Sequence, residues 1–219
     1  MGHRTELLKI QAENLQSVAE IHVRAFPESA LTRLGAEAVR RYYEWQLTGP
    51  HDHEFVGVWR QRNLLGFAVA GISRGAMSGF VRQNAGFLFS RVLMRPWLVC
   101  GSRFRGRLRL ALRGFSRKKA SPQPVPVPAP VRSFGVLAIA VDPACQGEGG
   151  GKLLMNHLEK TATERGFERM HLTVAANNQR AISFYERLGW GKVSSGGDWA
   201  GRMHKGLSAR PARCVVLDK

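Results

Sequence analysis

The sequence lacks acidic residues over a long internal stretch. No Asp or Glu occurs between Glu54 and Asp142, whereas Lys and Arg residues there contribute 15 of the formal net charge of +17. The rest of the chain is therefore close to neutral. A hydrophobic content of 44% over 219 residues is that of a folded protein with one sizeable core, and it excludes a wholly disordered polybasic chain.

Cysteines are few, and long apolar runs are missing. Cys100, Cys145 and Cys214 are an odd number at scattered spacing, which fits neither a disulfide framework nor a metal site. The most apolar stretch, residues 85–101, is broken by two arginines and a proline. The first residues carry no apolar signal region. We therefore expect a cytoplasmic protein, with peripheral attachment to a membrane as an addition.

Strand and helix patterns alternate along most of the chain. Short apolar or period-two runs predict strands at residues 5–10, 53–60, 64–73, 133–141, 169–176 and 199–207. Apolar residues at helical spacing predict helices at residues 14–26, 32–47, 151–166 and 179–189. This order favours an α/β fold with at least one parallel pair of strands.

Residues from about 74 to 130 interrupt this alternation. They form the acid-free segment, and a proline-alternating stretch closes it. Within residues 103–115, basic and apolar side chains fall on opposite helical faces, which is typical of a helix on an anionic membrane surface. The alternatives are a lid packed on the domain, a cap over an acceptor site and, least favoured, a nucleic-acid contact.

A glutamine and four glycines come directly before an apolar helical run, in "CQGEGGGKLLM" at residues 145–155. The start of a helix exposes unpaired N–H groups and the positive end of the helix dipole, and glycines let an anion approach them. The P-loop pattern is excluded because Lys152 is followed by Leu153, and no G-x-G-x-x-G occurs here. The turn nevertheless predicts a phosphate site.

Two motifs resemble those of the GCN5-related N-acetyltransferase (GNAT) superfamily. Residues 146–151 match its Q/R-x-x-G-x-G/A turn, and "NNQRAISFYERLGW" at residues 177–190 is similar to its N-x-x-A-x-x-F-Y-E-x-x-G-F/W helix. The resemblance implies an α/β fold with a mixed, mostly antiparallel central sheet flanked by helices. It also implies one acetyltransferase domain over residues 1–207, interrupted by the basic helical insertion at about 74–130, and a tail at 208–219.

The resemblance further implies an activity and a co-substrate. Such a protein transfers an acetyl group from acetyl-CoA to the amine of a small molecule or peptide, by direct attack in a ternary complex. The glycine turn would hold the pyrophosphate, and strand 133–141 would pair with the pantetheine arm. The implied binding residues are Val141, Gln146, Gly147, Gly149, Gly150, Gly151, Lys152 and Asn178. No metal is expected.

Two residues are implied in the chemistry itself. Ile139, seven residues before the start of the glycine turn, would polarise the thioester carbonyl with its backbone N–H. Tyr185 would protonate the departing thiolate as a general acid. The alternative is a module that binds CoA, or a membrane surface through the insertion, without turnover.

The general base is not assigned by the resemblance. The histone-type branch places a glutamate four residues before the oxyanion donor, and that position here is Gly135. Glu28, Glu54 and loss of the proton through water are the alternatives. We interpret His22 and His171 as core or surface histidines because both lie in periodic segments.

Overall fold

A seven-stranded sheet forms the centre of the molecule. The computed structural model describes residues 5–73, 76–94, 132–193 and 199–207. The strand order is β1-β2-β3-β4-β5-β7-β6, and among the described pairs only β4 and β5 run parallel. The strands are β1 Thr5–Lys9, β2 Asp52–Arg60, β3 Asn63–Ile72, β4 Ser133–Val141, β5 Arg169–Thr173, β6 Gly191–Lys192 and β7 Arg202–Gly206. The expected mixed, mostly antiparallel sheet is confirmed.

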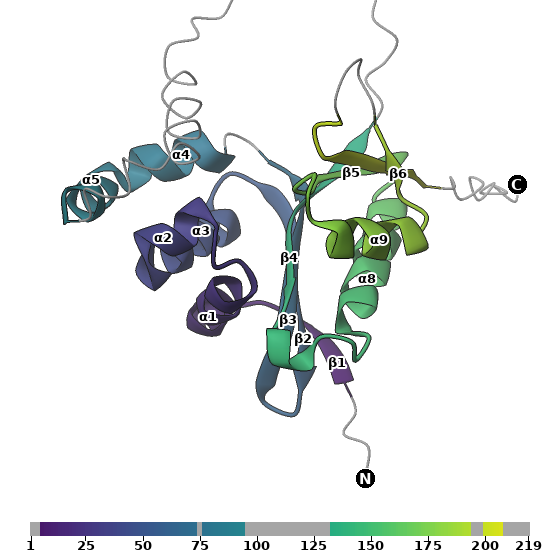
Figure 1. Ribbon diagram of the computed structural model, residues 1–219, viewed down its shortest axis with the longest axis horizontal. Helices are drawn as coiled ribbons and strands as arrows, with labels where there is room; N and C mark the ends of the chain where they lie inside the picture. Colours follow the sequence, from purple (N-terminus) through teal and green to yellow (C-terminus); the bar gives the residue numbers. More distant parts are fainter. Residues whose placement is uncertain (1–4, 74–75, 95–131, 194–198, 208–219) are drawn as a thin grey trace, which may run out of the picture.

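Helices cover both faces of the sheet (Figure 1). One face carries α1 Leu15–Ala25, α2 Ala30–Leu34 and α3 Ala36–Thr48, and the other carries α8 Gly150–Glu164 and α9 Gln179–Arg187. Beyond α2 and α3 lie α4 Ala76–Gln83 and α5 Ala85–Met94. Single-turn 3₁₀ helices occur at η1 Ala12–Asn14 and η2 Pro143–Cys145.

Each face of the sheet has its own hydrophobic core. Because side chains alternate along a strand, β2 sends Val58 towards α8 and Phe55 towards α1 and α3. The core under α8 includes the fully buried Phe134 and Leu158, and the core under α1 and α3 includes the fully buried Tyr43. The sheet is therefore a shared wall between two apolar layers.

The single helix expected at residues 32–47 is wrong. The chain forms α2 and α3 with a break at Gly35, whose φ of 104° is a conformation that other residues rarely adopt. Helix α2 also begins earlier than expected, because the Ser29 hydroxyl accepts a hydrogen bond from the Thr32 N–H at 3.0 Å. The two-residue strand β6 was likewise not expected.

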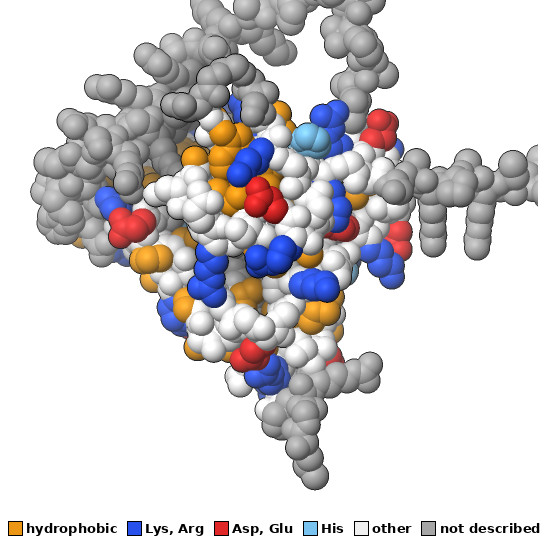
Figure 2. All heavy atoms as spheres, turned by 45° about the vertical axis from the view of Figure 1, so that its right-hand side comes forward, with side chains coloured by type: hydrophobic (Ala, Val, Ile, Leu, Met, Phe, Trp, Pro, Cys, Tyr) orange, Lys and Arg blue, Asp and Glu red, His pale blue; other side chains and the backbone are white. Residues whose placement is uncertain are grey.

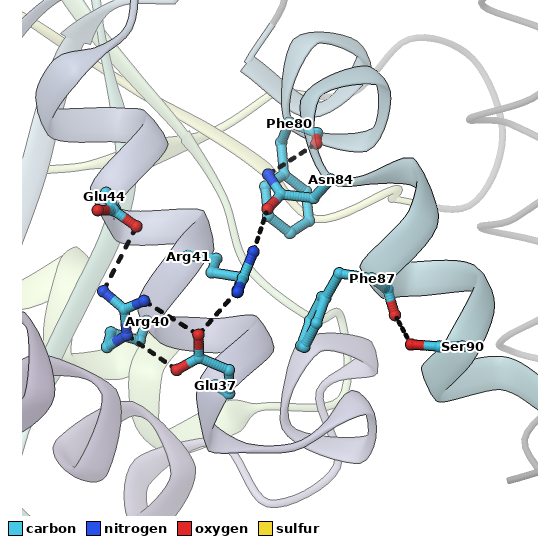
Figure 3. A network of polar contacts seen from close by, with 8 residues as sticks. All are labelled: Glu37, Arg40, Arg41, Glu44, Phe80, Asn84, Phe87 and Ser90. Atoms are coloured by element: carbon cyan, nitrogen blue, oxygen red, sulfur yellow. Dashed lines mark hydrogen bonds and ion pairs between the residues drawn. The ribbon is translucent and has the colours of Figure 1, made fainter. Parts of the chain in front are cut away.

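Polar contacts attach α4 and α5 to α3 (Figure 3). Arg41 donates to the Asn84 side chain at 3.4 Å, and its guanidinium lies 4.4 Å from the centre of the Phe87 ring. Glu37 accepts hydrogen bonds from Arg40 and Arg41, and the Arg40 bond is the main cause that lowers the Glu37 pKa to about 2. The residues that follow β3 are thus anchored beside the helical layer.

The basic helix expected at residues 103–115, the proline-alternating stretch and the tail at 208–219 all lie outside the described residues. Within the described ranges, no helix is long and apolar enough to cross a membrane. On the side that carries α8 and α9, Lys and Arg side chains are spread among acidic and uncharged ones (Figure 2).

We expect the packing of α8 to contribute strongly to stability. Leu158→Ala removes a fully buried side chain and should lower the free energy of unfolding by about 2–5 kcal/mol, measured by urea denaturation. Leu153→Ala, on the exposed side of the same helix, is the matched control and should change it by less than about 1 kcal/mol. Equal losses for the two variants would contradict the packing described here.

Candidate functional site

The turn after β4 is fixed by Asp142. One oxygen of its carboxylate accepts a hydrogen bond from the Ala144 N–H at 3.0 Å, and the other accepts one from Arg24 of α1 at 2.7 Å. These contacts, the backbone bond first, lower the pKa of Asp142. The charged pair therefore ties the exit of β4 to the helix on the opposite face of the sheet.

Two of the glycines are required by backbone conformation. Gly147 and Gly149 have φ values of 95° and 86°, and a Cβ at either position would meet no atom within 4 Å. Gly150 and Gly151 open α8, and a Cβ on Gly151 would lie 3.4 Å from the Phe184 ring. The turn thus presents backbone to open space on one side and packs against α9 on the other.

The first turn of α8 leaves backbone donors unpaired within the helix. Its first intrahelical bond runs from the Leu153 N–H to the Gly149 carbonyl at 3.1 Å. The N–H groups of Gly150, Gly151 and Lys152 precede this bond, so they have no intrahelical acceptor. Together with the helix dipole and the exposed Lys152, they form a positive, donor-rich surface that suits an anion.

Side chains from the turn also fold back onto the sheet. The Gln146 amide donates to the Val141 carbonyl at 3.1 Å, and Glu148 pairs with Arg60 at the end of β2. Gln146 thereby occupies the last backbone acceptor of β4. Gln146, an implied binding residue, therefore holds the turn against the strand.

Strands β4 and β5 stay together for only three described residue pairs, which end at Gly135 and His171. Strand β4 continues to pair with β3 as far as Val141, and the Asp142 N–H donates to the Leu65 carbonyl at 2.8 Å. Because backbone groups alternate in direction along a strand, the N–H groups of Ile139 and Val141 point away from β3. They face the gap that β5 has left.

An irregularity in β4 accompanies this gap. Val69 pairs with Ala138 and Ala70 pairs with Val136, so Leu137 is an extra residue in the β4 strand. Such a bulge bends a strand and increases its twist. We attribute the parting of β4 from β5 to this bend.

A cavity of about 480 Å³ lies where the two strands part. Its lining residues come from the end of β3, the first half of β4 and the second half of β5, and no Asp or Glu is among those described there. The polar side chains in this lining are Ser73, Ser133, His171 and Thr173. The cavity therefore offers neutral hydrogen-bonding groups and one imidazole.

Tyr185 and Asn178 both belong to α9. Tyr185 is 8% exposed and packs against Phe184 and Trp190, with ring centres 5.3 and 6.0 Å away. Burial raises its pKa to about 12, so it remains a protonated phenol at neutral pH. The Asn178 side chain caps α9 by accepting from the Ala181 N–H at 3.1 Å.

The structure brings most of the implied site residues to one region, and it separates the two carboxylates from the cavity. Phe184 contacts the start of α8, which places α9 beside the glycine turn. Glu54 is buried against α8, 3.0 Å from His157 and 3.4 Å from Arg165. Glu28 pairs with Arg33. Neither carboxylate lines the cavity.

Sequence reasoning missed the position of His171. Its side chain lies over Gly135, and its Nδ1 is 2.7 Å from the Ser133 hydroxyl. The available signal was the glycine at the position where the histone-type branch has glutamate, but the pairing register that sets His171 opposite it is a property of the folded sheet.

Comparisons with known proteins show which proteins this architecture, a split parallel pair beside a glycine turn at a helix start, resembles. Residues 121–190 match the model of the acetyltransferase (GNAT) family. The mycothiol acetyltransferase of Jonesia denitrificans is 35% identical over 77 residues, which cover 35% of this chain and 22% of that protein. The [ribosomal protein bS18]-alanine N-acetyltransferase of Escherichia coli is 41% identical over 56 residues, covering 26% and 38%.

Solved structures share the fold over nearly the whole chain. The Escherichia coli ribosomal-protein-S18-alanine N-acetyltransferase has a TM-score of 0.56 at 16% identity, covering 96% of this chain and 98% of that one. The PaiA N-acetyltransferase of Thermoplasma acidophilum, solved with coenzyme A, also has a TM-score of 0.56, at 15% identity and with 93% and 99% covered. The matched segments span well under half of the two curated relatives. Residues 121–190 therefore resemble the GNAT family of acetyltransferases, and the chain shares the fold of solved acetyltransferases.

Burial of the tyrosines predicts a delayed alkaline titration. The chain has three tyrosines, and burial raises the pKa of Tyr42 and Tyr185 to about 12 and that of Tyr43 well above 10. Since the folded-state pKa lies above the unfolded value, the stability these phenols contribute is present below about pH 10 and is lost as the pH rises further. An ultraviolet absorbance titration should show little tyrosinate in the folded protein at about pH 11 and much more in urea. Coincident titrations would contradict the burial of Tyr185.

Proposed function

We propose that this protein is an acetyl-CoA-dependent N-acetyltransferase that acetylates an amine by direct attack within a ternary complex. The observation that carries the proposal is the pair of outward-facing β4 N–H groups, on Ile139 and Val141, next to the donor-rich start of α8. The match of residues 121–190 to the acetyltransferase (GNAT) family supports the same function. We further propose that residues 1–207 form one domain, interrupted by an insertion at about 74–130, with a tail at 208–219.

The residues present fit acetyl-CoA. Its pyrophosphate needs backbone donors on an open surface, which the N–H groups of Gly147, Gly149, Gly150, Gly151 and Lys152 would supply. Its pantetheine arm carries amides, which would continue the sheet at Val141. Gln146 would help by holding the turn against β4. Asn178 would contribute from the start of α9, where its side chain is already fixed as a cap.

Acetyl-CoA supplies an acetyl thioester that an amine can attack. The backbone N–H of Ile139 would donate to the carbonyl oxygen as negative charge develops there, a contribution of a few kcal/mol in comparable sites. Tyr185 would give its proton to the departing sulfur. Its raised pKa keeps the phenol protonated at neutral pH, so that the proton is available when the C–S bond breaks.

The acceptor would enter from the cavity beside β4 and β5. The relatives' names mention molecules as different as mycothiol and an alanine of a ribosomal protein, so the shared segment does not choose between a small molecule and a peptide as acceptor. The cavity lining does limit which acceptors would bind. With no carboxylate among its described residues, it has no group to pair with a second ammonium on the acceptor.

The glycine turn gives the first test of this proposal. Calorimetric titration with acetyl-CoA should show binding to the wild type and loss of binding in Gly149→Asp/Gly151→Asp, because two carboxylates would meet the pyrophosphate. The control is Gly86→Asp/Gly191→Asp, which makes the same change of charge at two open positions away from the turn. The control should bind like the wild type. Equal binding by all three folded proteins would contradict a phosphate site here.

Tyr185 gives the second test. Tyr185→Phe removes the proton donor and leaves the ring contacts in place, so kcat should fall about 100-fold or more while the Kd for acetyl-CoA stays the same. The two values are obtained from thiol release and from calorimetry. An unchanged kcat would exclude Tyr185 as the general acid.

A further inference from the structure

The attacking amine must be neutral, yet most amines are ammonium ions at neutral pH, so the site needs a proton acceptor. Gly135 has no side chain to act as one. Glu54 is engaged with His157 and Arg165 on the α8 side, and Glu28 lies outside the cavity. Among the described residues that line the cavity, His171 is the one whose side chain can take a proton near neutral pH.

His171 occupies the space that a side chain at position 135 would need. A Cβ built on Gly135 would lie 2.9 Å from Nε2 and 3.0 Å from Cε1 of His171. The imidazole therefore lies directly over the glycine, where β4 and β5 still pair and just before they part. The absence of a glutamate at position 135 and the position of His171 are therefore linked, because the glycine leaves space for the imidazole ring.

The ring orientation is set by Ser133. The distance of 2.7 Å between Nδ1 and the Ser133 hydroxyl is that of a hydrogen bond. If Nδ1–H donates to the hydroxyl oxygen, Nε2 carries the lone pair over Gly135, at the wall of the cavity. Ser133 would then hold the tautomer in which Nε2 is a base.

The groups around His171 favour its neutral form. Arg169 lies two residues before it on the same face of β5, and His204 is its cross-strand partner on β7, with Arg202 next to it. From β4 and β3, Ser133 and Ser73 face the cavity, and Ser73 is bonded to His53. No carboxylate faces the ring from these described strands. Burial, and secondarily Arg169, lower the pKa of His171.

We propose, on the basis of the acetyltransferase function proposed above, that His171 is the general base that deprotonates the acceptor ammonium. The ammonium gives one proton to Nε2, and its nitrogen then forms the N–C bond as the C–S bond breaks. Tyr185 protonates the departing sulfur, the nitrogen loses its second proton to water, and Tyr185 takes one proton back from water. The proton on Nε2 passes to solvent, so one proton is released for each acetyl group transferred.

Acceptors that differ in basicity separate this role from a structural one. A peptide with an N-terminal alanine and benzylamine are ammonium ions at neutral pH, whereas aniline is already neutral. His171→Gln should lower kcat/KM about 100-fold or more for the ammonium acceptors and much less for aniline. The wild type should show an acidic limb in its pH profile below neutral pH, and His171→Gln should lose that limb. His157→Gln, which keeps a donor for Glu54 on the opposite face, is the control and should behave like the wild type.

Moving the base from position 171 to position 135 tests whether the two side chains would occupy the same space. In His171→Ala the ring atoms that oppose a Cβ on Gly135 are gone, and the next contact, the Gly71 carbonyl, is at an ordinary 3.4 Å. Gly135→Glu/His171→Ala should therefore recover part of the activity with ammonium acceptors. Gly135→Gln/His171→Ala has the same shape without a base and should not recover it. Recovery of activity in both double variants would overturn the proposal. Recovery in neither double variant would also overturn it if His171→Gln remains fully active.

A measurement that needs no acceptor separates this inference from the proposed function. Nitrogen-15 NMR of histidine-labelled protein reports which ring nitrogen of His171 carries the proton, with His171→Gln for assignment. A proton on Nδ1 supports the proposal, and a proton on Nε2 overturns it. If the wild type releases no CoA with any probe amine, the proposed function fails and the general-base role fails with it, while the tautomer still tests the arrangement of Ser133 and His171. If it turns over and His171→Gln keeps the wild-type rate and pH profile, only the inference fails.

Discussion

The site depends on one unfilled position in the sheet, where β4 continues and β5 no longer lies beside it. Backbone N–H and C=O groups in the middle of a sheet must be paired or solvated, because leaving them buried without a partner costs free energy comparable to a lost hydrogen bond. The Val141 carbonyl is paired, because it accepts a hydrogen bond from the Gln146 amide. The N–H groups of Ile139 and Val141 remain directed at the gap. A ligand with amide or carbonyl groups would complete the sheet there.

The bulge at Leu137 divides β4 into one part that leads to the glycine turn and one part that lines the cavity. Beyond it, β4 leads to the glycine turn and the positive start of α8, which suit the phosphates of a ligand. Before it, Gly135 and Ser133 form the cavity wall with His171, where an acceptor would enter. The reacting groups would therefore meet near the parting of the strands, with Tyr185 fixed beside the turn by the contact of Phe184 with α8.

Local sequence signals predicted much of this structure. The strand at residues 133–141 was predicted with the bounds that are observed, and Gly166 and Gly189 follow the ends of α8 and α9 with positive φ. The break at Gly35 was missed because a continuous helical spacing of apolar residues runs across it. The position of His171 depends on which residues of two distant strands pair, and no local pattern encodes that register. For this reason the sequence alone did not indicate His171 as a candidate base.

Hydrogen exchange of individual amides, measured by NMR with and without acetyl-CoA, shows whether the ligand lies in the gap beside β4. Saturating acetyl-CoA should slow exchange at Ile139, Val141, Gly150, Gly151 and Lys152, while core amides such as that of Leu158 should change little. Slowed exchange at both β4 and the start of α8 would place the ligand across the gap and the turn. Binding that leaves the amides of Ile139 and Val141 unchanged would contradict the idea that the parted strand is the site.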